Sequence, residues 1–202
     1  MCGIFGQISK NKINKKKFSS LVSHSAQRGV DSSGLVYFDG EYRIFRADYH
    51  IKKLLKKVKP FGSQAVFGHS RLITNGLSDN QPVIRKGVCL VHNGIVTNVK
   101  KAWTEIKLKP NLQIDSEIIA AIADLHISEG GDLSELPERV FSITKGVISC
   151  ALLVPSLGKI LLFSNNGSLY NGQHGTDIFF ASESYPLSKI GCKQIKQIKV
   201  NI

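Results

Sequence analysis

The second residue of the chain is a cysteine that directly follows the initiator methionine. Methionine before a small side chain is normally removed, which would leave Cys2 with a free α-amino group beside its thiol. The reference pKa of an α-amine is about 7.7 to 8.0 and that of a thiol about 8.5, so the amine can take the thiol proton near neutral pH. This pair predicts a nucleophile that needs no separate catalytic histidine. A plainer interpretation is a small apolar residue that begins a strand.

Short motifs follow Cys2 along nearly the whole chain. They are residues 2–6 (CGIFG), 27–34 (QRGVDSSG), 68–74 (GHSRLIT), 92–94 (HNG), 115–117 (DSE) and 181–183 (ASE). Each motif alone is weak evidence. Their succession, however, resembles the glutaminase domain of class II (N-terminal-nucleophile) glutamine amidotransferases, in the order that this family shows.

The resemblance implies a reaction and a set of substrate contacts. L-Glutamine would be hydrolysed to L-glutamate and ammonia through a γ-glutamyl thioester on Cys2, without a metal or cofactor. Arg71 would bind the α-carboxylate through its guanidinium fork, Asp115 would accept from the α-ammonium, and Thr74 would hydrogen-bond the substrate. Asp115 is also a good helix N-cap, and Thr74 is equally compatible with a solvent-facing loop hydroxyl.

The resemblance also implies an oxyanion hole made by the Asn93 side chain and the Gly94 backbone N–H. Such donors stabilise negative charge that appears only in the tetrahedral intermediate. An Asn-Gly pair taken alone is more typical of a turn, so the functional interpretation depends on its place in the series of motifs. Arg28 and Asp31 are assigned to the architecture of the site, because a buried Arg paired with an Asp is more often structural than catalytic.

Two histidines, His69 and His92, stand at the ends of apolar runs. Neither has further ligands at a spacing typical of zinc sites. We therefore expect hydrogen-bonded core histidines and no metal site.

The motifs leave the branch of the family open. Residues 92–95 (HNGI) are similar to the amino-sugar synthase branch, whereas 97–98 (TN), 115–117 (DSE) and 181–184 (ASES) look more like the phosphoribosyl-pyrophosphate amidotransferase branch. Leu72 departs from the aromatic residue of both branches, and Gln27 replaces the usual histidine before Arg28. The contacts to an ammonia acceptor therefore stay open.

The elements that must position these residues alternate in type along the chain. Apolar patterning predicts strands at 2–8, 34–39, 42–46, 64–69 and 87–92, helices at 14–26, 97–107, 116–127 and 133–143 with a lysine-rich helical turn near 51–59, and strands at 147–154, 159–163, 168–171 and 177–182. This order predicts an α+β domain. The resemblance implies a four-layer αββα sandwich of two antiparallel sheets, of the N-terminal-nucleophile hydrolase type. We expect one glutaminase domain over residues 2–202 with no acceptor or synthase domain, so ammonia would pass to a partner or missing domain.

Composition bears on the cellular compartment and the possible partners of the protein. The four cysteines form no C-x-x-C pair, which favours reduced thiols in the cytoplasm, and no apolar stretch is long enough to cross a membrane. Lys and Arg exceed Asp and Glu by 12. That excess could serve a nucleic acid, an anionic substrate or an acidic partner, but it is mostly lysine on expected helix faces, and no nucleic-acid signature accompanies it.

Two other functions remain open from the residues. The first is an N-terminal-nucleophile hydrolase of a different amide, with Arg71 and Asp115 merely structural. The second is a non-catalytic basic interaction module in which Met1 stays on and Cys2 is inert. A substrate panel separates the first from glutamine hydrolysis, and the intact mass of the N-terminus separates the second.

Overall fold

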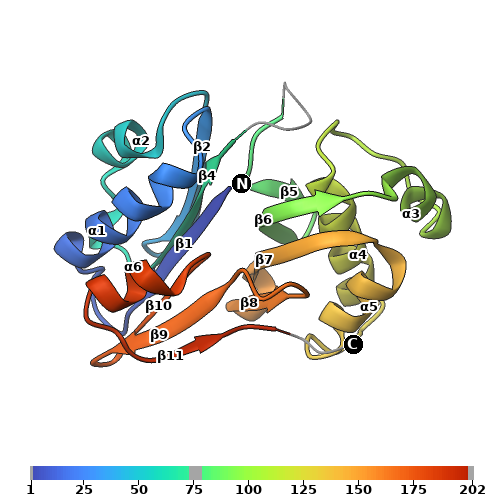
Figure 1. Cartoon of the computed structure of the whole chain (residues 1–202). Helices are drawn as coiled ribbons and strands as arrows, with labels where there is room; N and C mark the ends of the chain where they lie inside the picture. The colour runs from blue at the N-terminus through green and yellow to red at the C-terminus, as the bar shows by residue number, and fades with distance from the viewer. Residues whose placement is uncertain (1, 73–78, 200–202) are drawn as a thin grey trace.

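A computed structural model describes residues 2–72 and 79–199 of the chain. Two antiparallel sheets lie face to face, and helices cover both outer faces (Figure 1). Over the larger sheet lie α1 (Lys15–Ser25), α2 (Ile51–Val58) and α6 (Ser184–Lys189), and over the smaller sheet lie α3 (Val99–Glu105), α4 (Ser116–Ser128) and α5 (Leu136–Ile143). The predicted four-layer αββα sandwich is confirmed. No helix in the described ranges is long and apolar enough to cross a bilayer.

The larger sheet holds the N-terminal strand near its centre. Its described strands run in the order β11-β9-β10-β1-β4-β2-β3, each antiparallel to its neighbours. They are β1 (Gly3–Ile8), β2 (Ser32–Phe38), β3 (Tyr42–Ala47), β4 (Ala65–Arg71), β9 (Tyr170–His174), β10 (Asp177–Ala181) and β11 (Lys193–Gln197). Because β1 is paired on both sides, the residue just before it has a fixed position.

The smaller sheet is built from strands in the middle of the chain. Its order is β5-β6-β7-β8, with β5 (Val83–Arg85), β6 (Val88–Val96), β7 (Gly146–Val154) and β8 (Lys159–Ser164). Strand β6 pairs with β7 along its whole length, from Cys89 opposite Leu153 to Val96 opposite Gly146. The β6–β7 pairing is thus continuous through Asn93 and Gly94.

Three apolar clusters fill the three interfaces between the layers. In β1, Phe5 packs beneath α1 against Phe18, with ring centroids 5.8 Å apart, while the neighbouring Ile4 belongs to the cluster between the sheets. In β6, Leu90 belongs to the cluster under α4, and Val91 to the cluster between the sheets. This alternation is what a strand buried on both faces requires.

The predicted strands and α-helices are present with some shifted ends; β9, expected at 168–171, runs from Tyr170 to His174. Strands β5 and β11 and helix α6 were not predicted from the sequence. Strand β6 was expected to end at residue 92, but it continues to Val96 and contains both Asn93 and Gly94. The Asn-Gly pair therefore does not form a turn.

Gly3 lets the end of α1 approach the start of β1. A Cβ atom at this position would lie 2.5 Å from the carbonyl oxygen of Ser25, the last residue of α1. Real Cβ atoms do not approach a backbone oxygen so closely, so any larger residue would have to push the helix away from the strand. The glycine after Cys2 thus fixes the chain next to the predicted nucleophile.

We predict that Gly3→Ala lowers the free energy of unfolding by about 1–3 kcal/mol, the usual cost of overpacking. Gly62→Ala is the matched control, since nothing lies within 4 Å of a Cβ built there. That variant should be unchanged or slightly more stable, because alanine restricts the unfolded chain. Urea unfolding of both variants measures the difference. Equal stabilities would show that the close approach at Gly3 does not constrain the fold.

Candidate active site

Cys2 lies where the two sheets meet at one end. Its backbone N–H donates to the side-chain Oδ1 of Asn93 at 3.1 Å, and its Sγ donates to the backbone oxygen of Leu72 at 3.6 Å. Cys2 precedes β1 of the larger sheet, whereas Asn93 belongs to β6 of the smaller one. This contact joins the predicted nucleophile directly to the predicted oxyanion residue.

The backbone around Cys2 is held from a second side by residues from both ends of the chain. Arg28 donates from Nε to the backbone oxygen of Cys2 at 3.0 Å and forms an ion pair with Glu183. Ser182 accepts from the Ile4 N–H at 2.9 Å through Oγ, and its own N–H donates to the Ile4 oxygen at 3.0 Å. The late ASE motif thus anchors the N-terminal strand.

Burial raises the pKa of the Cys2 thiol above its ordinary value. The positive charge of Arg71 lowers that pKa and the negative charge of Asp115 raises it, so both groups act electrostatically on the sulfur. The thiol is therefore protonated near neutral pH, and attack on a substrate requires a base to remove its proton.

Gly94 has a backbone conformation that only glycine adopts easily. Its φ is +148°, and a Cβ atom would lie 1.8 Å from the carbonyl oxygen of Val147 on the neighbouring strand. The preceding Asn93 is 4% exposed and sits in a regular register opposite Ser149. Gly94 is therefore a local backbone distortion within a strand. Backbone strain of this kind is often found at functional sites.

Arg71 ends β4 and is 3% exposed. Its Nη1 donates to the backbone oxygen of Asp79 and to Oδ1 of Asn80, the latter at 3.2 Å. Burial lowers the pKa of the guanidinium, whereas Asp115, Asp79 and Asp31 favour its charged form. Arginine keeps its charge in proteins, so the site holds a buried cation close to Cys2.

Asp115 stands at the N-cap position of α4, but its side chain does not cap the helix. Oδ2 accepts instead from the Val96 N–H at 2.8 Å, and Ser116 Oγ donates to Oδ1 at 3.4 Å. Asp115 therefore occupies the expected N-cap position, but the expectation of a capping hydrogen bond to its side chain is wrong. The carboxylate is tied to the end of β6, three residues after Asn93.

A buried polar network supports β6 from behind. His92 contacts Ser116 Oγ through Nδ1 at 2.9 Å and the Val147 oxygen through Nε2 at 3.3 Å, and Gln81 bonds both the N–H and the oxygen of His92 at 2.6 and 3.0 Å. His92 is thus the hydrogen-bonded core histidine that was expected. His69 differs, because its buried ring nitrogens make no hydrogen bond of normal geometry within the described residues, and burial lowers its pKa to about 3.

The structure brings most of the predicted residues to one place. Cys2, Asn93, Gly94, Arg71 and Asp115 converge there, while Thr74 lies outside the described residues. An open cavity of about 410 Å³ adjoins them, lined by Gln27, Arg28, Gly29, Val30, Leu72 and Glu183. Among the described residues no group of His, Cys, Asp or Glu side chains could hold a metal ion.

Arg28 and Asp31 both lie beside the site. Arg28 forms an ion pair with Glu183, and the Asp31 N–H donates to the Arg71 oxygen at 3.1 Å. The sequence motifs contained Glu183 but gave no sign of this pairing. No sequence motif pointed to Gln81, because its side chain bonds the backbone of His92, eleven residues away.

Comparison with known proteins decides the family. Residues 69–189 match the family model described as the glutamine amidotransferase domain. The chain belongs to this family. The amidophosphoribosyltransferase of Pasteurella multocida (strain Pm70) is 28% identical over 98% of this chain, and the glutamine–fructose-6-phosphate aminotransferase (isomerizing) of Rhizobium leguminosarum bv. viciae is 27% identical over 93%.

The fold agrees with that assignment. The glutamine phosphoribosylpyrophosphate amidotransferase from B. subtilis superposes with a TM-score of 0.78 over 98% of this chain, at 19% identity. Together the family and the two-sheet fold identify a class II glutamine amidotransferase domain. The chain spans 45% of the Pasteurella relative and 32% of the Rhizobium one.

A buried carboxylate organises the approach to Asp115 in this amidotransferase domain. Glu117 is 1% exposed and accepts from Arg85 Nη1 at 2.6 Å and from the backbone N–H groups of Asn111 and Leu112 at 2.9 and 2.8 Å. It therefore fixes the loop that leads into α4. The sequence motif contained Glu117, but its contacts with β5 and this loop were not expected.

We predict that Glu117→Gln lowers the free energy of unfolding by about 3 kcal/mol or more, because it leaves Arg85 buried without an anionic partner. Glu129→Gln is the control, since it breaks an Arg139 ion pair of 2.8 Å whose side chains are 34% and 49% exposed. Exposed pairs contribute at most about 1 kcal/mol. Chemical unfolding compares the two, and similar losses would mean that the buried network adds nothing special.

Proposed function

We propose that this chain hydrolyses L-glutamine to L-glutamate and ammonia, with Cys2 as the nucleophile of the mature protein. The observation that carries the proposal is the hydrogen bond of 3.1 Å from the Cys2 N–H to Asn93 Oδ1. It ties the Cys2 backbone to the amide side chain of a residue on a strand of the other sheet. Membership of the glutamine amidotransferase domain family supports glutamine as the substrate.

Removal of Met1 would make the Cys2 nitrogen a free amine and hence the base of the reaction. Because burial raises the thiol pKa, the amine must take the proton as Sγ attacks the substrate amide carbon. It would return this proton to the leaving nitrogen, which departs as ammonia when the C–N bond breaks. Water then attacks the γ-glutamyl thioester, and its cleavage frees glutamate and restores the thiol.

The oxyanion of each tetrahedral intermediate would be bound by Asn93 and Gly94. Since Asn93 Oδ1 already accepts from the Cys2 nitrogen, its Nδ2 is the atom available for donation to the substrate oxygen. Gly94 would contribute its backbone N–H, and its φ of +148° departs from that of a regular strand. Donors fixed before the reaction need no reorganisation when charge develops.

The α-carboxylate and α-ammonium of glutamine would be recognised by Arg71 and Asp115. Support comes from their burial, their opposite charges and their electrostatic effects on Cys2. Thr74 is proposed as a further hydrogen-bonding group for the substrate. Arg28 and Asp31 would maintain the architecture, Arg28 through the Cys2 oxygen and Asp31 through the Arg71 backbone.

We further propose that residues 2–202 form one glutaminase unit whose ammonia passes to a synthase domain or subunit. The names of the Pasteurella and Rhizobium relatives point to two acceptor chemistries, a purine-type and an amino-sugar type. Leu72, which differs from the aromatic residue of both branches, favours neither. All four cysteines are free thiols, which supports a reducing, cytoplasmic compartment.

Asn93→Asp tests the mechanism. Aspartate keeps the size and the acceptor oxygen that bonds the Cys2 nitrogen, but it replaces the donor with a negative charge where negative charge must develop. We predict that the variant folds, still binds glutamate, and loses glutaminase kcat by about 100-fold or more, as for other oxyanion donors. Glutamate release and glutamate affinity are measured on the same preparation.

Asn14→Asp is the matched control, because Asn14 caps α1 by accepting from Lys17 N–H at 3.0 Å and aspartate caps equally well. Its rate should equal that of the wild type. A near-normal rate for Asn93→Asp would remove Asn93 from the oxyanion hole. A wild-type protein that turns over another amide but not glutamine would overturn the substrate assignment.

A further inference from the structure

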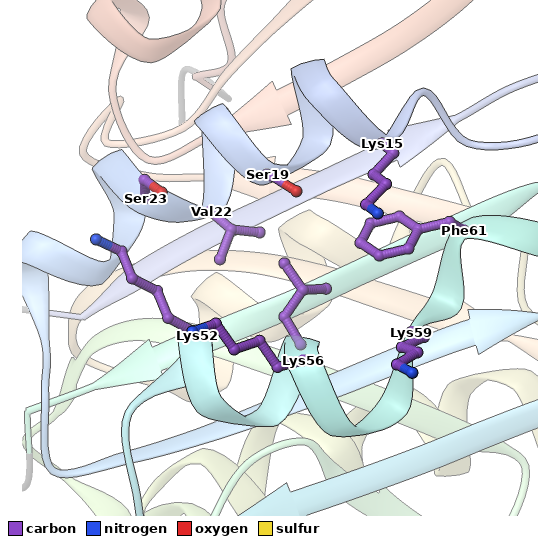
Figure 2. Close-up of a pocket in the computed structure, with 9 residues that line it drawn as sticks. Lys15, Ser19, Val22, Ser23, Lys52, Lys56, Lys59 and Phe61 are labelled. Carbon is purple, nitrogen blue, oxygen red and sulfur yellow. The ribbon is translucent and has the colours of Figure 1, made fainter.

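A groove runs between α1 and α2 on the outer face of the larger sheet (Figure 2). Its volume is about 360 Å³. The lining residues repeat at helical spacing on both helices and are Lys15, Ser19, Val22, Ser23, Lys52, Leu55, Lys56, Lys59 and Phe61. We call it the α1–α2 groove.

The positive charge of the protein is concentrated in the two segments that contain α1 and α2. Residues 10–28 and 49–64 contain eleven lysines and arginines and not one aspartate or glutamate, in a chain with a net charge of +12. The rest of the chain is therefore close to neutral. Such asymmetry points to a local anionic partner rather than to a generally basic protein.

The lysines of the groove are not neutralised within the protein. No ion pair joins Lys15, Lys52, Lys56 or Lys59 to a carboxylate in the described part of the chain. Moreover, neither helix has an acidic residue in its first turn. Lysines at the positive end of a helix dipole lower helix stability by a few tenths of a kcal/mol each. The fold itself therefore does not explain this pattern.

The floor of the groove is apolar. Val22 and Leu55 form it from the two helices, and the half-buried Phe61 closes one end, with the Lys15 ammonium 5.4 Å from its ring centroid. In Figure 2, Lys52, Lys56 and Lys59 lie on the α2 side, and Lys15 lies at one end of the α1 side beside Phe61. The groove thus offers an apolar strip with a positive edge along α2 and a single positive charge on the α1 side.

We propose that the α1–α2 groove binds an acidic amphipathic helix of another protein. Lys52, Lys56 and Lys59 are spread along about two helical turns of the α2 side, and Lys15 lies across the groove beside Phe61. One small anion could therefore reach only one or two of these lysines. A nucleic acid would meet the charges but leave the apolar floor without a matching surface. A helix with an apolar stripe flanked by carboxylates fits both features.

This surface is separate from the glutaminase site. None of its lining residues belongs to the set around Cys2, and the groove lies on the helix-covered face of the sheet while Cys2 lies at the end of β1 (Figure 1). The proposal therefore does not rest on glutamine hydrolysis. Variants in the groove should leave the glutaminase rate unchanged.

The test uses the full chain and a fluorescent synthetic helix of about 18 residues, with leucines at i, i+3/i+4 and i+7 and glutamates on both sides. A scrambled peptide of the same composition lacks the apolar stripe. We expect the helix to bind, the scrambled peptide to bind at least about tenfold more weakly, and added salt to weaken binding because exposed charges are screened. Fluorescence anisotropy gives the dissociation constants.

Two double variants of α2 carry the same change in net charge at different places. Lys52→Glu/Lys56→Glu alters the groove, whereas Lys53→Glu/Lys57→Glu alters lysines that lie over the Tyr49 ring, each at 4.9 Å, and do not line the groove. We expect the first to weaken peptide binding about tenfold or more and the second less than about threefold. Phe61→Ala should also weaken binding without changing its salt dependence.

Circular dichroism and the glutaminase rate show that each variant is folded. Equal losses in the two double variants would overturn the proposal, because binding would then follow net charge alone. So would equal affinity for the ordered and scrambled peptides, no binding of either, or tighter binding of a single-stranded RNA homopolymer that is insensitive to Phe61→Ala.

Discussion

The hydrogen bond between the Cys2 nitrogen and the Asn93 side chain is the contact on which the site depends. The two residues come from different sheets and are 91 positions apart, so only the completed sandwich brings them together. Two glycines make this possible, since Gly3 admits the end of α1 and Gly94 adopts a φ of +148° against Val147. Cys2, the proposed nucleophile, is thus positioned by packing between layers rather than by a local motif.

The charged groups Arg28 and Asp115 beside Cys2 each have a structural partner. Arg28 joins the Cys2 oxygen to Glu183, and Asp115 binds the end of β6. Buried charges are costly unless they are paired, which explains why these residues come from distant segments. The consequence is a rigid site in which a cation and an anion lie near a protonated thiol. His69, with no hydrogen bond of normal geometry in the described ranges, stays neutral because burial lowers its pKa to about 3.

The sequence predicted the layers and named the candidate site residues because both leave local signals. Long apolar runs such as β1 and β7 are readable, and the motifs contain the candidate residues directly. Strand β5 has three residues and β11 is largely polar and exposed, so neither has a readable period. The extension of β6 through Asn93 could not be predicted, since its strand pairing overrides the turn preference of Asn-Gly. The partners Glu183 and Gln81 depend on long-range contacts that no spacing rule contains.

The most direct test of Cys2 as the N-terminal nucleophile is intact-mass and peptide mass spectrometry after treatment with a diazoketone analogue of glutamine. We predict a chain that begins at Cys2 and carries one adduct, on that residue alone. Burial raises the pKa of Cys89 to about 12, that of Cys192 to about 11 and that of Cys150 well above its ordinary value, so these thiols should not react. A chain that keeps Met1, or comparable labelling of any of the other three cysteines, would contradict the account.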